Sequence, residues 1–194
     1  MDFYKNFLIN LTEAESQIWK FLVQGTANKK SKFHCPTLST IDGKKINSRT
    51  IILRKAEKKI KCLTFYTDNR SKKFKDIKKN KNVSIHIYDN RYKLQVQIYG
   101  KALLEHNSKK TKNIWRELSD FSKKIYMAKN IPGKKIINFN KINYFNDETK
   151  GYNNFSLILL KINRIECLQL LKNNNIRAEF NYKKDLITRN HLSP

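Results

Sequence analysis

The 194-residue sequence has no apolar run that approaches the ~20 residues of a membrane-spanning helix. Its three cysteines are too scattered for a CxxC pair or a disulfide framework, and its four histidines lack metal-ligand spacing. These residues are Cys35, Cys62, Cys167, His34, His86, His106 and His191. The opening MDFYKNFLIN lacks the cleavage site of a signal peptide. Together these absences predict a soluble, cytoplasmic protein with neither a membrane span nor a metal site.

Acidic residues are also scarce, since 16 Asp and Glu stand against 41 Lys and Arg and leave a formal net charge of +25. Such a charge attracts nucleic acid, anionic lipid or phosphorylated ligands. No basic run stands apart from a general excess of Lys, Asn and Ile, which favours biased composition over a function based on charge. Nucleic-acid binding through stacked tyrosines (Tyr88, Tyr92 and Tyr99) is a weaker interpretation than packing of these residues.

The amino-terminal part predicts a helix over residues 13–24. Thr12 and Glu15 have the spacing of a capping box, and Gly25 is a natural stop. The apolar face of this helix consists of Ile18, Phe21 and Leu22. The pattern changes to strands from Cys35 onward.

Residues 36–105 contain five strand-like runs that alternate apolar and polar residues. Asp42-Gly43 is a strong hairpin signal, a second turn is expected at 55–59, and a tight turn at Asn90-Arg91. A short helix is expected over 71–79, with Phe74 and Ile77 facing inward and Asn80 at its end.

The carboxy-terminal half predicts a helix over 108–129, which Pro132-Gly133 ends. Its expected apolar stripe consists of Ile114, Trp115, Leu118, Phe121 and Ile125. A loop with one irregular helical turn should lead to Tyr152, and the runs FSLILLKINRIECLQLL and IRAEFNY predict strands that return to the sheet.

These elements predict one domain over residues 1–194, mainly β with peripheral helices. The antiparallel strands and short turns are typical of a small barrel, which leaves no exposed sheet edge. The barrel core is expected at about 33–105, a helical insert at about 108–130, and the carboxy-terminal strands at about 155–194.

Three basic groups in this region could bind an anion. Arg49 lies within a strand, and Arg54 follows on the opposite face or beyond its end. Ser71-Lys72-Lys73 stands at a helix start, where free N–H groups and the helix dipole favour negative charge. Taken alone, each group could equally be a solvated surface feature.

The combination of three segments resembles the FMN-binding split barrels related to pyridoxamine 5′-phosphate oxidase. These segments are RTIILR at 49–54, FYTDNRSKK at 65–73 and QVQIYG at 95–100. Their order and separation agree with the family from about 36 to 105, and the closing NHLSP is similar to its carboxy-terminal pattern. WRELSDFSKKIYMAKNIPG resembles a subgroup of FMN-binding proteins that are not the proven oxidase.

The resemblance implies a role for eleven residues. Arg49, Ser71 and Lys72 would hold the FMN phosphate, with Lys73 near it, because guanidinium, ammonium and hydroxyl groups all donate to phosphate. The flavin ring would lie on the backbone of Thr50, Ile51 and Ile52, with Arg54 towards its N1 and C2 carbonyl edge. Tyr66 and Thr67 would line the pocket. Gln95 would reach the ring from the partner subunit of a homodimer.

Departures from the family pattern bear on the activity. The Tyr-x-x-x-Arg-x-x-x-Ser segment of the oxidase is absent around Tyr126, and Arg177 and Glu179 replace residues of its R-x-H-D-R stretch. The hypothesis is therefore an FMN-dependent oxidoreductase that acts on an unidentified small molecule. The alternatives are a true pyridoxamine or pyridoxine 5′-phosphate oxidase of vitamin B6 metabolism, or a non-catalytic flavin or haem carrier. No residue stands out as an obligatory acid or base, although Tyr66 and His86 could approach the pocket.

Overall fold

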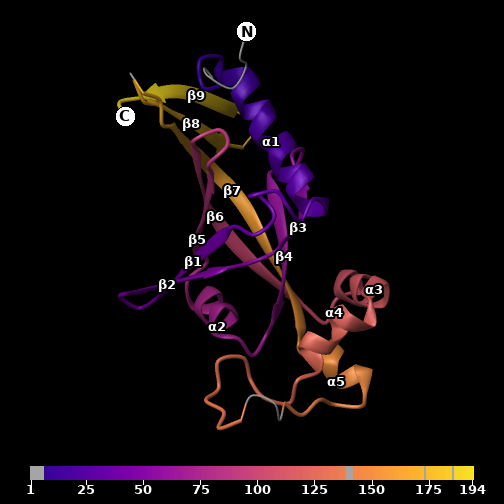
Figure 1. The fold of residues 1–194 in the computed structure, drawn as a ribbon. Helices are drawn as coiled ribbons and strands as arrows, with labels where there is room; N and C mark the ends of the chain where they lie inside the picture. Colours follow the sequence, from indigo (N-terminus) through magenta and orange to yellow (C-terminus); the bar gives the residue numbers. More distant parts are fainter. Residues whose placement is uncertain (1–6, 139–141, 173, 185) are drawn as a thin grey trace.

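The computed structural model describes residues 7–138, 142–172, 174–184 and 186–194, and it shows one nine-stranded antiparallel sheet with peripheral helices (Figure 1). The strands are β1 (Thr37–Asp42), β2 (Lys45–Thr50), β3 (Leu53–Glu57), β4 (Cys62–Asp68), β5 (Asn82–Asp89), β6 (Leu94–His106), β7 (Phe155–Gln169), β8 (Ile176–Lys183) and β9 (Leu186–Leu192). The helices are α1 (Leu11–Ala27), α2 (Lys72–Lys79), α3 (Lys109–Glu117), α4 (Asp120–Lys124), the 3-10 turn η1 (Ile125–Met127) and α5 (Glu148–Tyr152). The predicted fold class is confirmed.

The long strand β7 explains how the sheet divides. The strand order is β2-β1-β5-β6-β7-β4-β3, and β6 pairs with β7 along nearly its whole length. On the other edge of β7, β4 pairs with Phe155–Lys161 and β8 pairs with Arg164–Gln169. Two sheet segments therefore diverge from one strand, which is the arrangement expected of a split barrel. The division into one domain with a barrel core and an insert stays a prediction.

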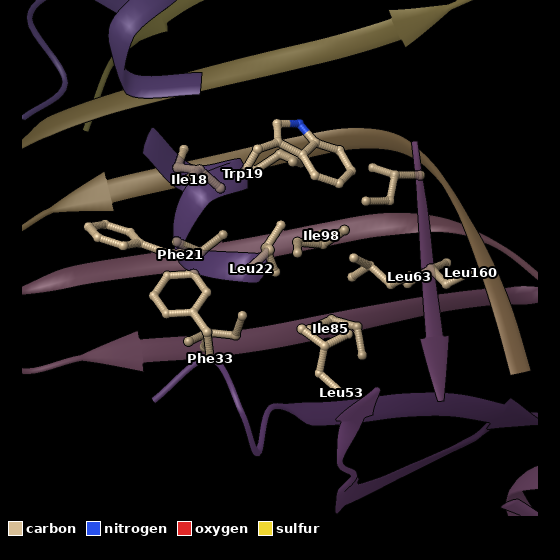
Figure 2. Packing of buried hydrophobic residues seen from close by; sticks show 14 of the residues in the cluster. Ile18, Trp19, Phe21, Leu22, Phe33, Leu53, Leu63, Ile85, Ile98 and Leu160 are labelled. Carbon is tan, nitrogen blue, oxygen red and sulfur yellow. The ribbon is translucent and has the colours of Figure 1, made fainter. Parts of the chain in front are cut away.

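The main core lies between α1 and the inner face of the sheet. Figure 2 shows Ile18, Trp19, Phe21 and Leu22 of α1 beside Phe33, Leu53, Ile85 and Ile98. Burying each such side chain contributes roughly 1.5–3 kcal/mol to stability. A second cluster of Trp115, Tyr126, Phe155 and Leu157 joins α3 and η1 to the start of β7. The apolar residues predicted for the first helix thus form its buried face.

The first helix differs from its prediction at both ends. Its cap is Asn10, whose side chain accepts hydrogen bonds from the N–H groups of Thr12 and Glu13. The predicted stop, Gly25, lies inside the helix. An added Cβ at Gly25 would stand 2.8 Å from the backbone carbon of Phe33, so a glycine serves close packing here and not termination.

The first two turns lie later than expected, and the third begins at the predicted Asn90 but is longer. The first hairpin pairs Asp42 with Lys45, so Gly43 (φ +61°) and Lys44 form its loop. The second turn spans 58–61, and the third spans 90–93. The helix predicted at 71–79 is confirmed as α2, which begins after Ser71 and ends before Asn80.

The continuous helix predicted over 108–129 is wrong. The chain forms α3, then α4 and η1, because Leu118 leaves the helical conformation and the Ser119 side chain caps a new helix. Phe121 is 83% exposed and Ile125 is 63% exposed, so the predicted apolar stripe ends at Leu118. Pro132-Gly133 forms a later turn, after the helical run has ended.

The carboxy-terminal strands are confirmed as β7 and β8, and β9 continues the sheet at its edge. The helical turn expected before Tyr152 is α5, although residues 139–141 of the preceding loop are outside the described ranges. The first six residues, which belong to the segment analysed for a signal peptide, are likewise outside them. Among the helices that the structure describes, none has the length and apolarity to cross a membrane.

Candidate functional site

Arg49 projects from β2 towards the inner face of the sheet. It pairs with the fully buried Leu38, and opposite residues of an antiparallel pair share a face. Its Nη1 donates to Thr40 Oγ1 at 2.6 Å and lies 3.4 Å from the Leu38 carbonyl oxygen. Its Nη2 lies 3.6 Å from Oδ2 of Asp76 on α2. Arg49 therefore joins β2 to α2 through Asp76, and Figure 1 shows these two elements close together.

The start of α2 carries a hydroxyl group that does not cap the helix. Ser71 is buried, its side chain makes no capping bond, and its Oγ lies 3.3 Å from Thr67 Oγ1. The N–H groups of the first helical turn have no intrahelical acceptor. Ser71 and this turn can together donate several hydrogen bonds to an anion.

The two lysines after Ser71 differ in their surroundings. Lys72 is 59% exposed at its side chain and donates to Asp42 Oδ2 at 2.7 Å, outside the group around Ser71. Lys73 is partly buried. Burial, followed by the nearby Arg49, lowers the pKa of the Lys73 ammonium below its ordinary value, while Asp68 opposes the shift. Two cations thus crowd together where an anion would relieve their repulsion.

The backbone between β2 and β3 leaves the sheet ladder at Ile51 and Ile52. The Ile51 N–H donates to the Pro36 carbonyl at 2.9 Å, and the Leu53 N–H donates to the His34 carbonyl at 2.9 Å. The side chain of Ile51 is buried and that of Ile52 is exposed. The strand that contains Arg49 therefore ends at Thr50, and Arg54 belongs to the next strand, which begins at Leu53.

Arg54 and Tyr66 lie on the opposite face from Arg49. Phe65 pairs with Leu53 in the core, so the next residue, Tyr66, points to the other side of β4. The Arg54 guanidinium lies 5.2 Å from the centre of the Tyr66 ring. Its Nε is buried and has no hydrogen-bond partner in the described part of the chain. A buried donor without a partner is costly, so this group is suited to a ligand acceptor.

Tyr126 and Phe155 form the wall behind Tyr66. The Phe155 ring meets Tyr66 edge-on at 5.3 Å and Tyr126 edge-on at 5.0 Å. Burial raises the pKa of both phenols above their ordinary value, and Arg54 offsets part of the shift. Both tyrosines are therefore protonated at neutral pH and can donate a hydrogen bond.

Sequence reasoning missed two acids that organise these groups. Asp76 is only 2% exposed and accepts hydrogen bonds from Thr40 and Asn47. Asp68 forms a bidentate pair with Arg70, whose Nη2 also donates to the Ala128 carbonyl at 3.0 Å and so ties η1 to β4. The one available signal for Asp76 was that it is the sole acid of the lysine-rich α2.

Within one chain, Gln95 lies apart from the other candidate residues. It pairs with Tyr88 and Leu168 on the outer face of the sheet. His86 lies on the same face, between Thr37 and Gln97. Both could reach a ligand only if another molecule covered this face. Within the described ranges, no group of three or more His, Cys, Asp or Glu residues could hold a metal ion.

A comparison of the sequence with known protein families finds one match. A family model described as the FMN-binding domain of pyridoxamine 5′-phosphate oxidase matches residues 16–106. Residues 16–106 are therefore similar to this family. The pyridoxamine 5′-phosphate oxidase-like domain thus includes Arg49, Arg54, Ser71 and Gln95, and the resemblance predicted from the three segments is confirmed. The sequence matches no curated protein.

Solved structures support the same fold. A pyridoxamine 5′-phosphate oxidase-related, FMN-binding protein from Nostoc punctiforme has a TM-score of 0.74 at 20% identity, covering 92% of this chain and 96% of its own. PhzG from Burkholderia lata, solved with tetrahydrophenazine-1-carboxylic acid, has a TM-score of 0.74 at 13% identity and covers 100% of this chain and 97% of its own. General stress protein 26 from Bacillus anthracis has a TM-score of 0.51 at 18% identity, with coverage of 79% and 99%.

The residues of the pyridoxamine 5′-phosphate oxidase-like domain suit FMN chemically. The cations and hydroxyl at the start of α2 suit a phosphate group, and the Nε donor of Arg54 suits a carbonyl or ring nitrogen acceptor. The aromatic wall beside Arg54 suits the edge of a planar ring.

Proposed function

We propose that the protein binds FMN and uses it as an oxidoreductase acting on a small organic molecule. The observation that carries the proposal is an anion site at Ser71, Arg49 and Lys73 together with the buried, unpartnered Arg54 Nε, which β4 connects: Thr67 contacts Ser71, and the neighbouring Tyr66 contacts Arg54. An anion alone would use only the first group. A molecule that has both a phosphate and a polar ring would use both.

In this proposal Arg49, Ser71 and Lys73 bind the phosphate, and Lys72 joins them only if its ammonium leaves Asp42. Thr50, Ile51 and Ile52 offer the irregular backbone edge to the ring, while Thr67 orients the Ser71 hydroxyl. Bound flavin would supply a reversible hydride acceptor. Arg54 would compensate negative charge on the reduced ring, and Tyr66 and Tyr126 would exclude water from that edge.

The substrate is unidentified, and the aromatic wall favours a flat molecule. PhzG was solved with a reduced heteroaromatic carboxylic acid, so compounds of this class belong in a substrate screen together with pyridoxine and pyridoxamine phosphates. The departures at Arg177 and Glu179 argue against the B6 compounds. Arg177 is paired with Glu166, and Glu179 Oε2 lies 3.8 Å from Arg164, so both are already engaged.

The proposed active form is a homodimer, because Gln95 lies far from the other candidates in the sheet of its own chain. The outer face around it carries the partly exposed side chains of His86, Gln97 and Tyr99. A second copy on this face could bring Gln95 to its flavin site. We expect light scattering to give a particle mass of about twice the 23.1 kDa chain mass. A stable monomer that retains FMN would contradict the shared site. A cytoplasmic location stays a prediction.

A direct test of the function compares two ligands that differ only in the phosphate. Apo-protein should quench the fluorescence of FMN on binding, and riboflavin should bind at least about 100-fold more weakly, because a few charge-assisted hydrogen bonds contribute roughly 1.5–3 kcal/mol each. Equal affinity for the two ligands would contradict the phosphate site. Bleaching of the flavin by a compound of the screen would then identify the substrate class.

The pH dependence of FMN affinity provides a separate prediction. The pKa of Lys73 is lowered in the free protein, and a phosphate beside it would raise that pKa. Binding therefore takes up a proton above the free-state pKa, so affinity is full below this pKa and falls as the pH rises through it. Each unit by which binding raises the pKa allows up to about a tenfold loss.

This prediction is checked by titrating FMN and riboflavin between pH 7 and pH 10. Lys73→Arg keeps its charge throughout this range and should flatten the FMN profile relative to that of riboflavin. A wild-type profile that already runs parallel for the two ligands would show that Lys73 does not contact the phosphate.

A further inference from the structure

The carboxylate of Asp76 lies in an unusual place for a protein that binds an anion. It is buried on α2, and its Oδ2 accepts a hydrogen bond from Thr40 Oγ1 at 2.7 Å and another from Asn47 Nδ2 at 3.1 Å. Arg49 Nη2 lies 3.6 Å from the same oxygen, and Lys72 Nζ lies 3.6 Å from Oδ1. A negative charge one turn from Ser71 opposes the attraction of a phosphate.

Thr40 connects this carboxylate to Arg49. The Thr40 hydroxyl is fully buried, donates to Asp76 and accepts from Arg49 Nη1 at 2.6 Å. The Leu38 carbonyl oxygen accepts weakly from the same Nη1, at 3.4 Å. One end of the guanidinium is thereby fixed to the protein. In the described part of the chain, Arg49 Nε makes no hydrogen bond and Nη2 has only its 3.6 Å contact with Asp76, so Nε and the second N–H of Nη2 stay available to a ligand.

We propose that Asp76 is a positioning residue for the phosphate site: acting through Thr40, it holds the Arg49 guanidinium so that Nε and Nη2 face the ligand. This inference rests on the proposed function. Asp76 lowers the local positive charge, yet it fixes a side chain with many rotamers before the ligand arrives. Preorganisation of this kind strengthens binding because less side-chain freedom is lost in the complex.

The two effects of Asp76 predict opposite results for its removal. If only charge mattered, Asp76→Ala would bind FMN more tightly than the wild type. If positioning dominates, Asp76→Ala should bind FMN about tenfold more weakly, while its riboflavin affinity stays within about twofold, because riboflavin has no phosphate to contact Arg49.

Asp42→Asn is the matched control. Asp42 is another acid near the start of α2, and it pairs with Lys72 and Lys79 without contacting Arg49. Its removal changes the net charge by the same amount, so FMN affinity should be unchanged or higher. An equal loss in Asp42→Asn and Asp76→Ala would overturn the inference, since the loss would not come through Arg49.

Thr40→Val provides a second variant in case Asp76→Ala does not fold. It is close in size and removes the hydroxyl that joins Asp76 to Arg49, so it should cause the same selective loss of FMN affinity. Unchanged FMN affinity in either variant, or equal loss for FMN and riboflavin, would overturn the inference. A wild-type protein that does not prefer FMN to riboflavin would instead contradict the proposed function itself.

Discussion

Arg49→Ala is expected to weaken FMN binding by at least about 2 kcal/mol, or roughly 30-fold, and so to release the flavin during purification. Arg49 projects into the group formed by Thr40, Asp76 and the start of α2, where it is only partly exposed. A guanidinium offers phosphate a fixed fork of donors, and nothing else in this group can replace it. Titration of the apo-protein with FMN measures the loss.

Two control variants distinguish the guanidinium geometry of Arg49 from its positive charge. Arg49→Lys keeps the positive charge and should fall between the wild type and Arg49→Ala. Lys78→Ala removes one exposed positive charge elsewhere on α2 and should bind FMN normally. The circular dichroism of Arg49→Ala should match the wild type, because Asp76 keeps Thr40 and Asn47 as donors. Full FMN affinity in a folded Arg49→Ala protein would refute the role given to Arg49.

Arg189→Met is expected to lower the free energy of unfolding by about 3 kcal/mol, because it leaves the carboxylate of Glu15 buried without its cation. Glu15 lies on α1 and accepts from Arg189 Nη2 at 2.7 Å and from Tyr182 OH at 3.1 Å. Trp19 Nε1 in turn donates to Tyr182 at 3.1 Å. This network joins the first helix to the last two strands. Urea denaturation without flavin measures the change.

A second ion pair of similar length serves as the control for this prediction. Lys55 lies 2.8 Å from Glu57 on the exposed surface of β3, so Lys55→Ala should cost less than about 1 kcal/mol. Glu15→Gln combined with Arg189→Met should be more stable than Arg189→Met alone, because the buried charge is then gone. Equal stability of Arg189→Met and Lys55→Ala would show that the network does not hold α1 in place.

Local patterns in the sequence predicted the elements that local physics determines. The helix α2 begins after Ser71, ends before Asn80 and buries Ile77, so its limits could be predicted within one residue, although Phe74, also predicted to face inward, is only half-buried. The alternation of apolar and polar residues along β5 and β6 indicated which side chains face the core. The family resemblance, and not the local pattern, grouped Arg49, Ser71 and Lys72 in one site with Lys73 near it; in the structure Lys72 pairs with Asp42, and Lys73 is the lysine that Arg49 influences.

Tertiary contacts determined what local patterns could not show. Gly25 continues its helix because Phe33 packs against it, although glycine usually ends a helix. Lys72 and Lys73 are about 100° apart around α2, so only the docking of the helix decides which of them meets Arg49. Asp76, the sole acid of α2, looks like a surface residue in the sequence. Its partners Thr40 and Asn47 belong to a hairpin that is remote in the sequence but packs against α2.

The most direct test of the account is the visible spectrum of the purified protein, with mass identification of any chromophore released on denaturation. The protein is expected to show the absorption bands of oxidised flavin, either as isolated or after FMN is added, with about one FMN per chain. A folded protein that stays colourless after incubation with FMN would contradict it, and a Soret band would assign the barrel to haem instead.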